Sequence, residues 1–402
     1  EMVKMATLCL LALAFLAGVA DCFQNGASLS SLRSAKHTFR SLCSNDWPRK
    51  GLAMSASKPE SASSPSASAS ASAAPAPPAP AAVPPKPPST PSASQTAIAN
   101  PMLVGVAPAE RPNIPVTFED VSKAAHDIRG AVYVTPCARN PELSELTGCN
   151  LWLKAEYKQH TGSFKERGAR NALLQLSGEQ KKKGVIAASA GNHALGLAYH
   201  SKLLGIPVTV VMPTTAPITK VDKCRKLGAN VILKGLHIGE AKDFALSDPQ
   251  FAGMRYINGY DDPAIIAGAG SLGLEILDQV PNVDVVVVPV GGAGLIAGVA
   301  LAIKTVRPDV LIIGVEPERC ASYTAALKHG TPTPAAVSPT LADGLAVPCV
   351  GPHAFEVARH YVDRVVTVSE RQVALAVLRL IEHEKAVVEG GGAAGLAAPL
   401  PG

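Results

Sequence analysis

A lysine among small residues is the first place where this sequence could carry out covalent chemistry. The segment reads Thr161-Gly162-Ser163-Phe164-Lys165-Glu166-Arg167-Gly168-Ala169. Apolar Phe164 beside Lys165 would leave the amine partly desolvated, which lowers its pKa. A neutral lysine amine attacks aldehydes, so the pattern suits a covalent bond to an aldehyde cofactor. A solvated surface lysine is the alternative, and other motifs must decide between the two.

A glycine-rich turn is the second candidate. Gly291-Gly292-Ala293-Gly294 stands between a valine-rich run at 283–289 and a helix-like segment that starts at Leu295. Such a turn presents unpaired N–H groups and the positive end of a helix dipole, which together bind phosphate. The pattern is neither a dinucleotide fingerprint nor a P-loop. Ala293 is expected to keep a negative φ, because its methyl group disfavours the left-handed region. A tight turn whose glycines only relieve crowding is the alternative.

A second strand-to-helix turn, Ser189-Ala190-Gly191-Asn192-His193, is the third candidate. Its exposed N–H groups suit a carboxylate, and the Asn192 amide can form a hydrogen bond with a phenolic oxygen in either ionisation state. As an ordinary helix cap, Asn192 would need no function. Taken alone, this motif is a weak signal.

The elements that position these motifs follow an α/β pattern. Short apolar runs at 184–188, 207–212, 230–233, 283–289 and 310–315 are each followed by a turn and a helix-like segment. Continuous apolar runs indicate strands covered by helices on both faces, so we predict open, twisted, mostly parallel sheets. A helix is predicted over 372–384, with an apolar stripe of Val373, Val377, Leu380 and Ile381 facing a sheet.

The chain divides by composition. We interpret residues 1–22 as a signal peptide, 23–52 as a transit-like segment and 53–111 as a disordered Ala/Ser/Pro linker. This two-part leader favours a plastid location, with secretion or a mitochondrion as alternatives. Residues 115–183 and 259–402 are predicted to form a large cofactor-binding domain. Residues 184–258 would form a small domain that closes over the substrate, with the cofactor between the two.

Charge and cysteine content exclude several other classes. The net charge is +5, but the basic residues are dispersed, which argues against a nucleic-acid partner. No membrane association is expected of the mature form. The cysteines beyond the leader form no Cys-x-x-Cys pair, so we expect neither a disulfide framework nor a zinc site. They are interpreted as buried or semi-exposed free thiols, and they are Cys137, Cys149, Cys224, Cys320 and Cys349.

The three motifs, in this order, resemble those of the fold type II, tryptophan-synthase-β-like pyridoxal-phosphate enzymes, and more narrowly the threonine dehydratase and serine racemase family. The resemblance runs from about Thr135 to the C-terminus. It includes the further stretches Pro263-Ala264-Ile265-Ile266-Ala267-Gly268, Thr340-Leu341-Ala342-Asp343-Gly344 and Glu389-Gly390-Gly391-Gly392-Ala393.

The resemblance implies a role for each motif. Lys165 would bind pyridoxal 5'-phosphate covalently and move the substrate's Cα proton, Phe164 would pack against the ring, and Asn192 would contact the ring hydroxyl. The phosphate would lie on Gly291, Gly292, Ala293, Gly294 and the Leu295 amide. Ser189, Gly191, Asn192 and His193 would border the substrate. A homodimer is likewise implied by the resemblance alone.

The implied activity is removal of water and ammonia from L-threonine, and from L-serine, to give 2-oxobutanoate or pyruvate. Racemases that this sequence resembles have a second serine at position 190, where it can return a proton to Cα. Ala190 has no such proton, so the sequence favours a dehydratase, with a serine racemase on the same fold as the alternative.

Besides Ala293, which stands where the family often has glycine, two features depart from the family pattern. Glu316 matches a metal-binding carboxylate, but the acidic residue expected six positions later is Ser322. A divalent site of that design is therefore doubtful, and Glu316 could equally be a solvated loop acid. Relatives also continue into a Ser-Gly-Gly-Asn strand that partners the pyridine nitrogen, whereas this sequence stops at Gly402. We therefore expect a C-terminally truncated large domain, and a catalytically inactive cofactor-binding homologue is a further alternative.

Overall fold

The computed structural model describes residues 98–99 and 114–401. The predicted signal peptide, transit-like segment and almost all of the predicted linker lie outside these residues. Two four-stranded sheets organise the described part of the chain. The first has the order β1-β10-β9-β8, and its strands are β1 (Ile98–Ala99), β8 (Val285–Pro289), β9 (Leu311–Pro317) and β10 (Arg364–Val368). The second has the order β6-β5-β4-β7, and its strands are β4 (Val185–Ala188), β5 (Val208–Met212), β6 (Asn230–Leu233) and β7 (Arg255–Tyr256).

The strands are parallel in both sheets except where β1 pairs with β10. The predicted α/β class with mostly parallel open sheets is therefore confirmed. A short antiparallel ribbon joins β2 (Cys137–Arg139) to β3 (Trp152–Lys154). All four strands of the second sheet fall within 184–258, although the division of the chain into a large and a small domain stays a prediction.

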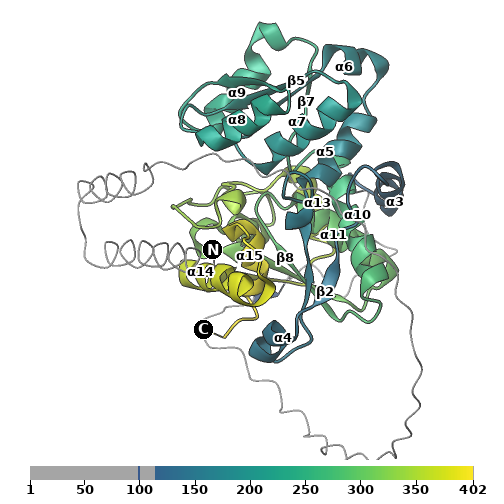
Figure 1. The fold of residues 1–402 in the computed structure, drawn as a ribbon, viewed down its shortest axis with the longest axis vertical. Coiled ribbons are helices and arrows are strands. Elements are labelled where there is room, and N and C mark those ends of the chain that lie inside the picture. The colour runs from purple at the N-terminus through teal and green to yellow at the C-terminus, as the bar shows by residue number, and fades with distance from the viewer. Residues whose placement is uncertain (1–97, 100–113, 402) are drawn as a thin grey trace, which may run out of the picture. The chain divides into compact units, whose positions relative to one another are not determined.

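Helices flank the sheets (Figure 1). Those that precede or surround the second sheet are α3 (Phe118–Asp127), α4 (Pro141–Thr147), α5 (Lys165–Leu174), α6 (Gly178–Lys183), α7 (Asn192–Leu204), α8 (Ile218–Lys226) and α9 (Ile238–Ser247). Those that follow are α10 (Pro263–Gln279), α11 (Gly294–Val306), α12 (Ser322–His329), α13 (Pro352–Ala358), α14 (Glu370–Arg379) and α15 (Gly390–Ala397). Short 3-10 turns occupy η3 (Glu156–Lys158), η4 (Pro249–Phe251), η5 (Glu318–Cys320) and η6 (Asp343–Leu345).

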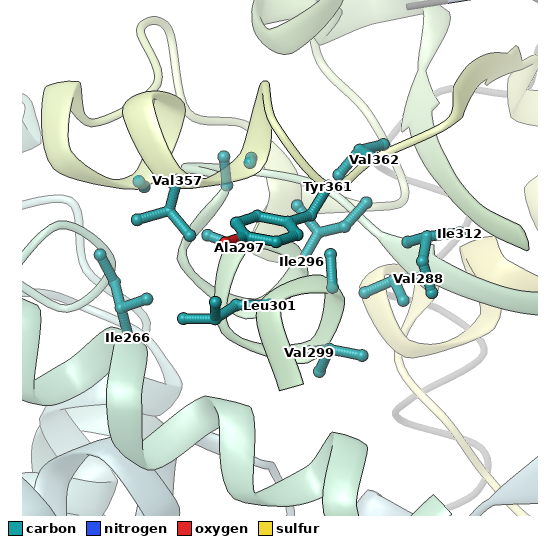
Figure 2. Close-up of a cluster of buried hydrophobic side chains, with 14 of the residues drawn as sticks. Ile266, Val288, Ile296, Ala297, Val299, Leu301, Ile312, Val357, Tyr361 and Val362 are labelled. Atoms are coloured by element: carbon teal, nitrogen blue, oxygen red, sulfur yellow. The ribbon is translucent and has the colours of Figure 1, made fainter. Parts of the chain in front are cut away.

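Each sheet has apolar cores on both faces, which is why its strands contain continuous apolar runs. In β8, Val286 and Val288 belong to the core that includes α11, while Val287 packs into the core that includes α15. Figure 2 shows the first of these cores, where Ile296, Val299 and Leu301 of α11 lie among side chains from the neighbouring elements. The predicted run at 283–289 begins two residues before the observed strand, and Val285 is exposed.

The predicted helix over 372–384 differs from the structure in its second half. α14 begins after a Ser369–Gln372 capping box and ends at Arg379, and a π-helical turn, η7 (Leu380–Glu384), follows. The wider turn changes the direction of the later side chains, because the helical repeat is no longer 3.6 residues. Val373 and Leu380 are buried as predicted, whereas Ile381 is exposed, so its place in the apolar stripe was wrong.

The described cysteines are all free, as predicted. Cys149 is exposed rather than semi-exposed, since it lies just beyond the C-cap of α4. No helix within residues 114–401 has both the length and the apolar character needed to cross a membrane.

Candidate active site

Lys165 is the first residue of α5, at the point where the helix packs between α7 and α10. Two glycines allow this close packing. A Cβ on Gly168 would lie 2.8 Å from the carbonyl oxygen of Ile265 in α10, and a Cβ on Gly196 in α7 would lie 3.2 Å from the carbonyl carbon of Lys165. A Cβ at Gly168 would force α5 and α10 apart, and one at Gly196 would displace the Lys165 backbone by a few tenths of an ångström.

The Lys165 amine is held by a backbone group rather than by a carboxylate. Its Nζ donates to the Gly259 carbonyl oxygen at 2.6 Å and lies 5.1 Å from the centre of the Phe164 ring. The residue is half-buried, and the surrounding protein lowers the pKa of the amine to about 8. The lysine is thus closer to its neutral, nucleophilic form than a solvated lysine, which favours the first of the two sequence interpretations.

The segment that receives this hydrogen bond also contacts the glycine-rich turn. A Cβ on Gly292 would lie 2.3 Å from Cγ of Tyr260, and one on Gly294 would lie 2.1 Å from the Tyr260 carbonyl oxygen. Gly259 and Tyr260 therefore connect the lysine to the turn, although no motif in the sequence singled them out. Their only signal was their position just before the Pro263–Gly268 stretch.

The glycine-rich turn places the amino end of α11 at the site. α11 begins at Gly294, and its N-cap residue, Ala293, supplies no side-chain cap. The first N–H groups of a helix lack intrahelical partners, so this end can bind an anion. Ala293 has a φ of 69°, and the expectation that it keeps a negative φ was wrong. Gly292 and Gly294, on either side of Ala293, pack closely against Tyr260. We attribute the left-handed conformation of Ala293 to this tertiary packing.

The Ser189–His193 segment leads into α7, whose first two residues are Asn192 and His193, and Gly191 rather than Asn192 is the N-cap residue. Ser189, Ala190 and Gly191 are half-buried, and a Cβ on Gly191 would meet no atom within 4 Å, so the backbone here is open to a small molecule. His193 is buried, with Nε2 3.1 Å from the Ile257 carbonyl oxygen and Nδ1 without a hydrogen-bond partner in the described part of the chain. Burial, together with the nearby Lys165, lowers the pKa of His193 to about 3, so the ring is neutral.

Asn192 is not a helix cap, and its side chain makes two long-range hydrogen bonds. Nζ of Lys220 donates to its Oδ1 at 3.2 Å, and its Nδ2 donates to Oε1 of Glu389 at 2.5 Å. No sequence motif predicted a role for Lys220. Glu389 lies in one of the stretches that carried the family resemblance, but no role was predicted for it.

An ionic network centred on the buried Arg167 holds the segment around Lys165 in place. Arg167, two residues after Lys165, is completely buried and pairs with Glu156 of η3 at 2.8 Å and with Glu275 of α10 at 2.6 Å. Lys154 of β3 pairs with Glu275 in turn, at 2.5 Å. These charges satisfy one another, and the network ties the start of α5 to β3, η3 and α10.

A second buried pair lies directly beside Lys165. Glu166 accepts a hydrogen bond from the Thr161 backbone N–H, and its Oε2 lies 3.2 Å from Nε2 of His200 in α7. Both side chains are completely buried. The pair therefore attaches the loop before Lys165 to the helix whose amino end carries Asn192 and His193.

Glu316, the candidate metal-binding carboxylate, acts as a helix cap in this structure, and its role as a metal ligand stays untested. It is completely buried, and its carboxylate caps the amino end of α12 by accepting from the Tyr323 N–H at 2.7 Å and from the N–H and hydroxyl of Thr324 at 2.8 and 2.7 Å. Burial raises its pKa to about 7. The alternative of a solvated loop acid was wrong. Among residues 98–99 and 114–401, no three histidine, cysteine, aspartate or glutamate side chains gather in a way that could hold a metal.

Comparison with known proteins identifies the family to which this site belongs. The model of a family described as "Pyridoxal-phosphate dependent enzyme" matches residues 128–401. The chain belongs to this family of pyridoxal-phosphate-dependent enzymes. It is 47% identical over 285 residues to an L-threonine ammonia-lyase of Thermotoga maritima, and the match covers 71% of each chain.

Solved structures of this family show the same fold. The processed form of threonine deaminase isoform 2 from Solanum lycopersicum is 37% identical, has a TM-score of 0.66, and is matched over 74% of this chain and 89% of its own. A serine racemase of Dictyostelium discoideum is 33% identical, has a TM-score of 0.67, and is matched over 71% of this chain and 92% of its own. The predicted family and fold are thereby confirmed.

The residues at this site fit the cofactor after which the family is named. A lysine amine with a lowered pKa, no salt bridge to it in the described part of the chain and an uncapped α11 terminus provide a nucleophile for an aldehyde and a cradle for a phosphate. The individual contacts implied by the resemblance stay predictions.

Proposed function

We propose that this protein is an L-threonine ammonia-lyase that also accepts L-serine, with pyridoxal 5'-phosphate as cofactor. One structural observation carries the proposal: the Lys165 amine, with its lowered pKa, is held by the Gly259 carbonyl, and the next residue, Tyr260, packs on the anion-binding turn before α11. The identity to the Thermotoga maritima L-threonine ammonia-lyase supports the choice of substrate.

Each residue then has a defined task. Pyridoxal phosphate, when bound, withdraws electrons from the substrate's Cα and so makes the Cα proton removable. Lys165 Nζ takes that proton, and its lowered pKa leaves it able to do so near neutral pH. The turn Gly291, Gly292, Ala293, Gly294 and Leu295 holds the phosphate, while the Ser189 to His193 turn receives the substrate carboxylate. His193 would contribute there through its backbone N–H, because its buried, neutral ring donates from Nε2 to the Ile257 carbonyl oxygen and its Nδ1 can then only accept.

Ala190 favours elimination over racemisation. It packs against the apolar core of the second sheet and carries no group that could deliver a proton to Cα. Racemisation needs a second proton donor on the opposite face from the lysine, so the geometry lacks one of its two groups. The likeness to serine racemases therefore concerns the fold and the lysine, and we propose the lyase activity as the principal one.

The experiment that tests this proposal uses the purified protein with added pyridoxal phosphate. L-threonine is expected to yield equal amounts of 2-oxobutanoate and ammonia, and L-serine to yield pyruvate without D-serine. Lys165→Ala should abolish both reactions and the visible absorption of the bound cofactor. The exposed Lys223 of α8 provides a matched control, because Lys223→Ala should leave both unchanged.

The outcomes separate the alternatives. Accumulation of D-serine would favour the racemase. A cofactor band without turnover of either amino acid would favour an inactive cofactor-binding homologue. Absence of any cofactor band from the intact protein would refute the proposal altogether.

We also propose a homodimer and a plastid location. The first is supported by the family resemblance and is tested by sedimentation equilibrium. The second is supported by the composition of residues 1–52 and is tested by imaging a fluorescent fusion of that leader.

A further inference from the structure

The Asn192 amide lies between two charged groups from distant parts of the chain. Lys220 belongs to the first turn of α8, which packs beside α7, and Glu389 directly precedes α15, which packs against β8 and η6. The hydrogen bonds from Lys220 to Asn192 and from Asn192 to Glu389 therefore join elements of the second sheet to elements of the first.

The two charges impose a single orientation on the amide. An ammonium group can only donate hydrogen bonds, and an ionised carboxylate can only accept them. The amide oxygen must therefore face Lys220, and the amide nitrogen must face Glu389. Rotating the amide by half a turn would place its NH₂ against the ammonium group and its oxygen against the carboxylate, so both bonds would be lost together.

This orientation limits what Asn192 can still do. Nδ2 has two hydrogens, and one of them is used by Glu389, so one N–H remains available as a donor. Asn192 is half-buried and Glu389 is exposed, so a small molecule can reach the amide. The neighbouring residue, His193, packs against Gly259, the residue whose carbonyl oxygen holds Lys165, because a Cβ on Gly259 would lie 2.6 Å from its Cγ.

We propose that Lys220 and Glu389 are positioning residues of the active site, which lock the Asn192 amide so that a free N–H faces the ring oxygen of the cofactor. An N–H donor stabilises that oxygen in its deprotonated form, whereas an amide free to rotate can instead offer its oxygen to the protonated form. Lys220 and Glu389 thus select the ionisation state of the ring oxygen without contacting it. This inference rests on the proposed function, because it requires that the cofactor be bound.

The test compares Lys220→Met and Glu389→Leu with the parent enzyme, each loaded with pyridoxal phosphate. Both substitutions remove the charge and keep an apolar side chain of moderate size. We expect the ratio of the visible to the near-ultraviolet absorption band to fall in both variants, because the protonated ring oxygen becomes more populated. We also expect kcat for L-threonine to fall about 10-fold to 100-fold, by analogy with the loss seen when residues that orient a metal ligand are removed.

Three further variants show whether the effect passes through Asn192. Lys220→Arg retains a donor and should restore most of the visible band. Lys223→Met, one turn further along α8 and exposed, should resemble the parent. In an Asn192→Ala background, Lys220→Met should have no additional effect on the band ratio, because a residue that acts through another has nothing left to orient.

The inference and the proposed function can fail separately. A parent enzyme without a cofactor band would refute the function. A parent with the band, combined with a Lys220→Met variant whose band ratio is unchanged, would refute the positioning role alone. A Lys220 effect of equal size with and without Asn192 would also overturn it.

Discussion

The lowered pKa of the Lys165 amine has a consequence for folding that is measurable without any cofactor. The pKa is about 8 in the folded apoprotein against an ordinary value of 10.5, and burial is the cause. Between these two values the unfolded chain holds a proton that the folded chain has released. Stability rises with pH wherever the unfolded state binds more protons. The amine therefore destabilises the fold below about pH 8, and this penalty disappears as the pH rises towards 10.5.

The size of the penalty follows from the two pKa values. Their difference, 10.5 minus 8, is 2.5, and each pKa unit corresponds to about 1.36 kcal/mol, which gives about 3 kcal/mol. Lys165→Met removes the charge and keeps an unbranched chain. The variant is expected to gain about 3 kcal/mol in its free energy of unfolding near pH 7, and less than about 1 kcal/mol near pH 10.5. Any change in packing adds a constant that does not depend on pH.

Urea unfolding of the two apoproteins, followed by circular dichroism at several pH values between about 7 and 10.5, measures this difference. Lys223→Met, at an exposed position of α8, is the matched control and should show no gain that depends on pH. A stability difference between Lys165→Met and the parent that stays the same across the whole range would refute the reasoning, because it would show that the amine carries its ordinary pKa in the fold.

Three other predictions follow from the site. Arg167→Met leaves the half-buried Glu156 without its cationic partner, while Glu275 keeps only Lys154, so the free energy of unfolding should fall by about 3–5 kcal/mol in a urea titration; a loss under 1 kcal/mol would contradict the ionic network. Ala190→Ser adds a proton donor, so D-serine should become detectable from L-serine with a D-amino-acid oxidase assay, and its continued absence would argue against the role given to this position. Gly292→Ala places a methyl group 2.3 Å from Cγ of Tyr260, so the apoprotein should bind pyridoxal phosphate at least about tenfold more weakly in a fluorescence titration, whereas unchanged affinity would exclude this turn as the phosphate site.

The strands and the candidate motifs were accessible from the sequence because they depend on local patterns. A strand covered on both faces needs an uninterrupted apolar run, and β4 and β5 lie where such runs occur. The glycine-rich turn was marked by composition, since only residues without a Cβ fit beneath Tyr260 at Gly292 and Gly294. Lys165 could be singled out because apolar Phe164 and small residues surround it in the sequence, and because the three motifs occur in the order typical of the family.

Two local predictions, the negative φ of Ala293 and the burial of Ile381, were wrong. The methyl group of Ala293 favours a negative φ, but packing of the turn against Tyr260 holds it at 69°. A regular helix would have placed Ile381 on the buried stripe, but the π-helical turn at Leu380–Glu384 exposes it. For Ala293 a contact from another part of the chain decided the geometry, and for Ile381 a change of helical repeat did so.

The sequence by itself determined the class of fold and singled out the candidate lysine and the candidate phosphate turn, because each is expressed within a short stretch of residues. Only the tertiary structure decided which groups meet the lysine and the Asn192 amide. Gly259 is 94 positions from Lys165, and Glu389 is 197 positions from Asn192. No periodicity or spacing encodes such pairs, because they depend on how strands and helices pack after the chain has folded.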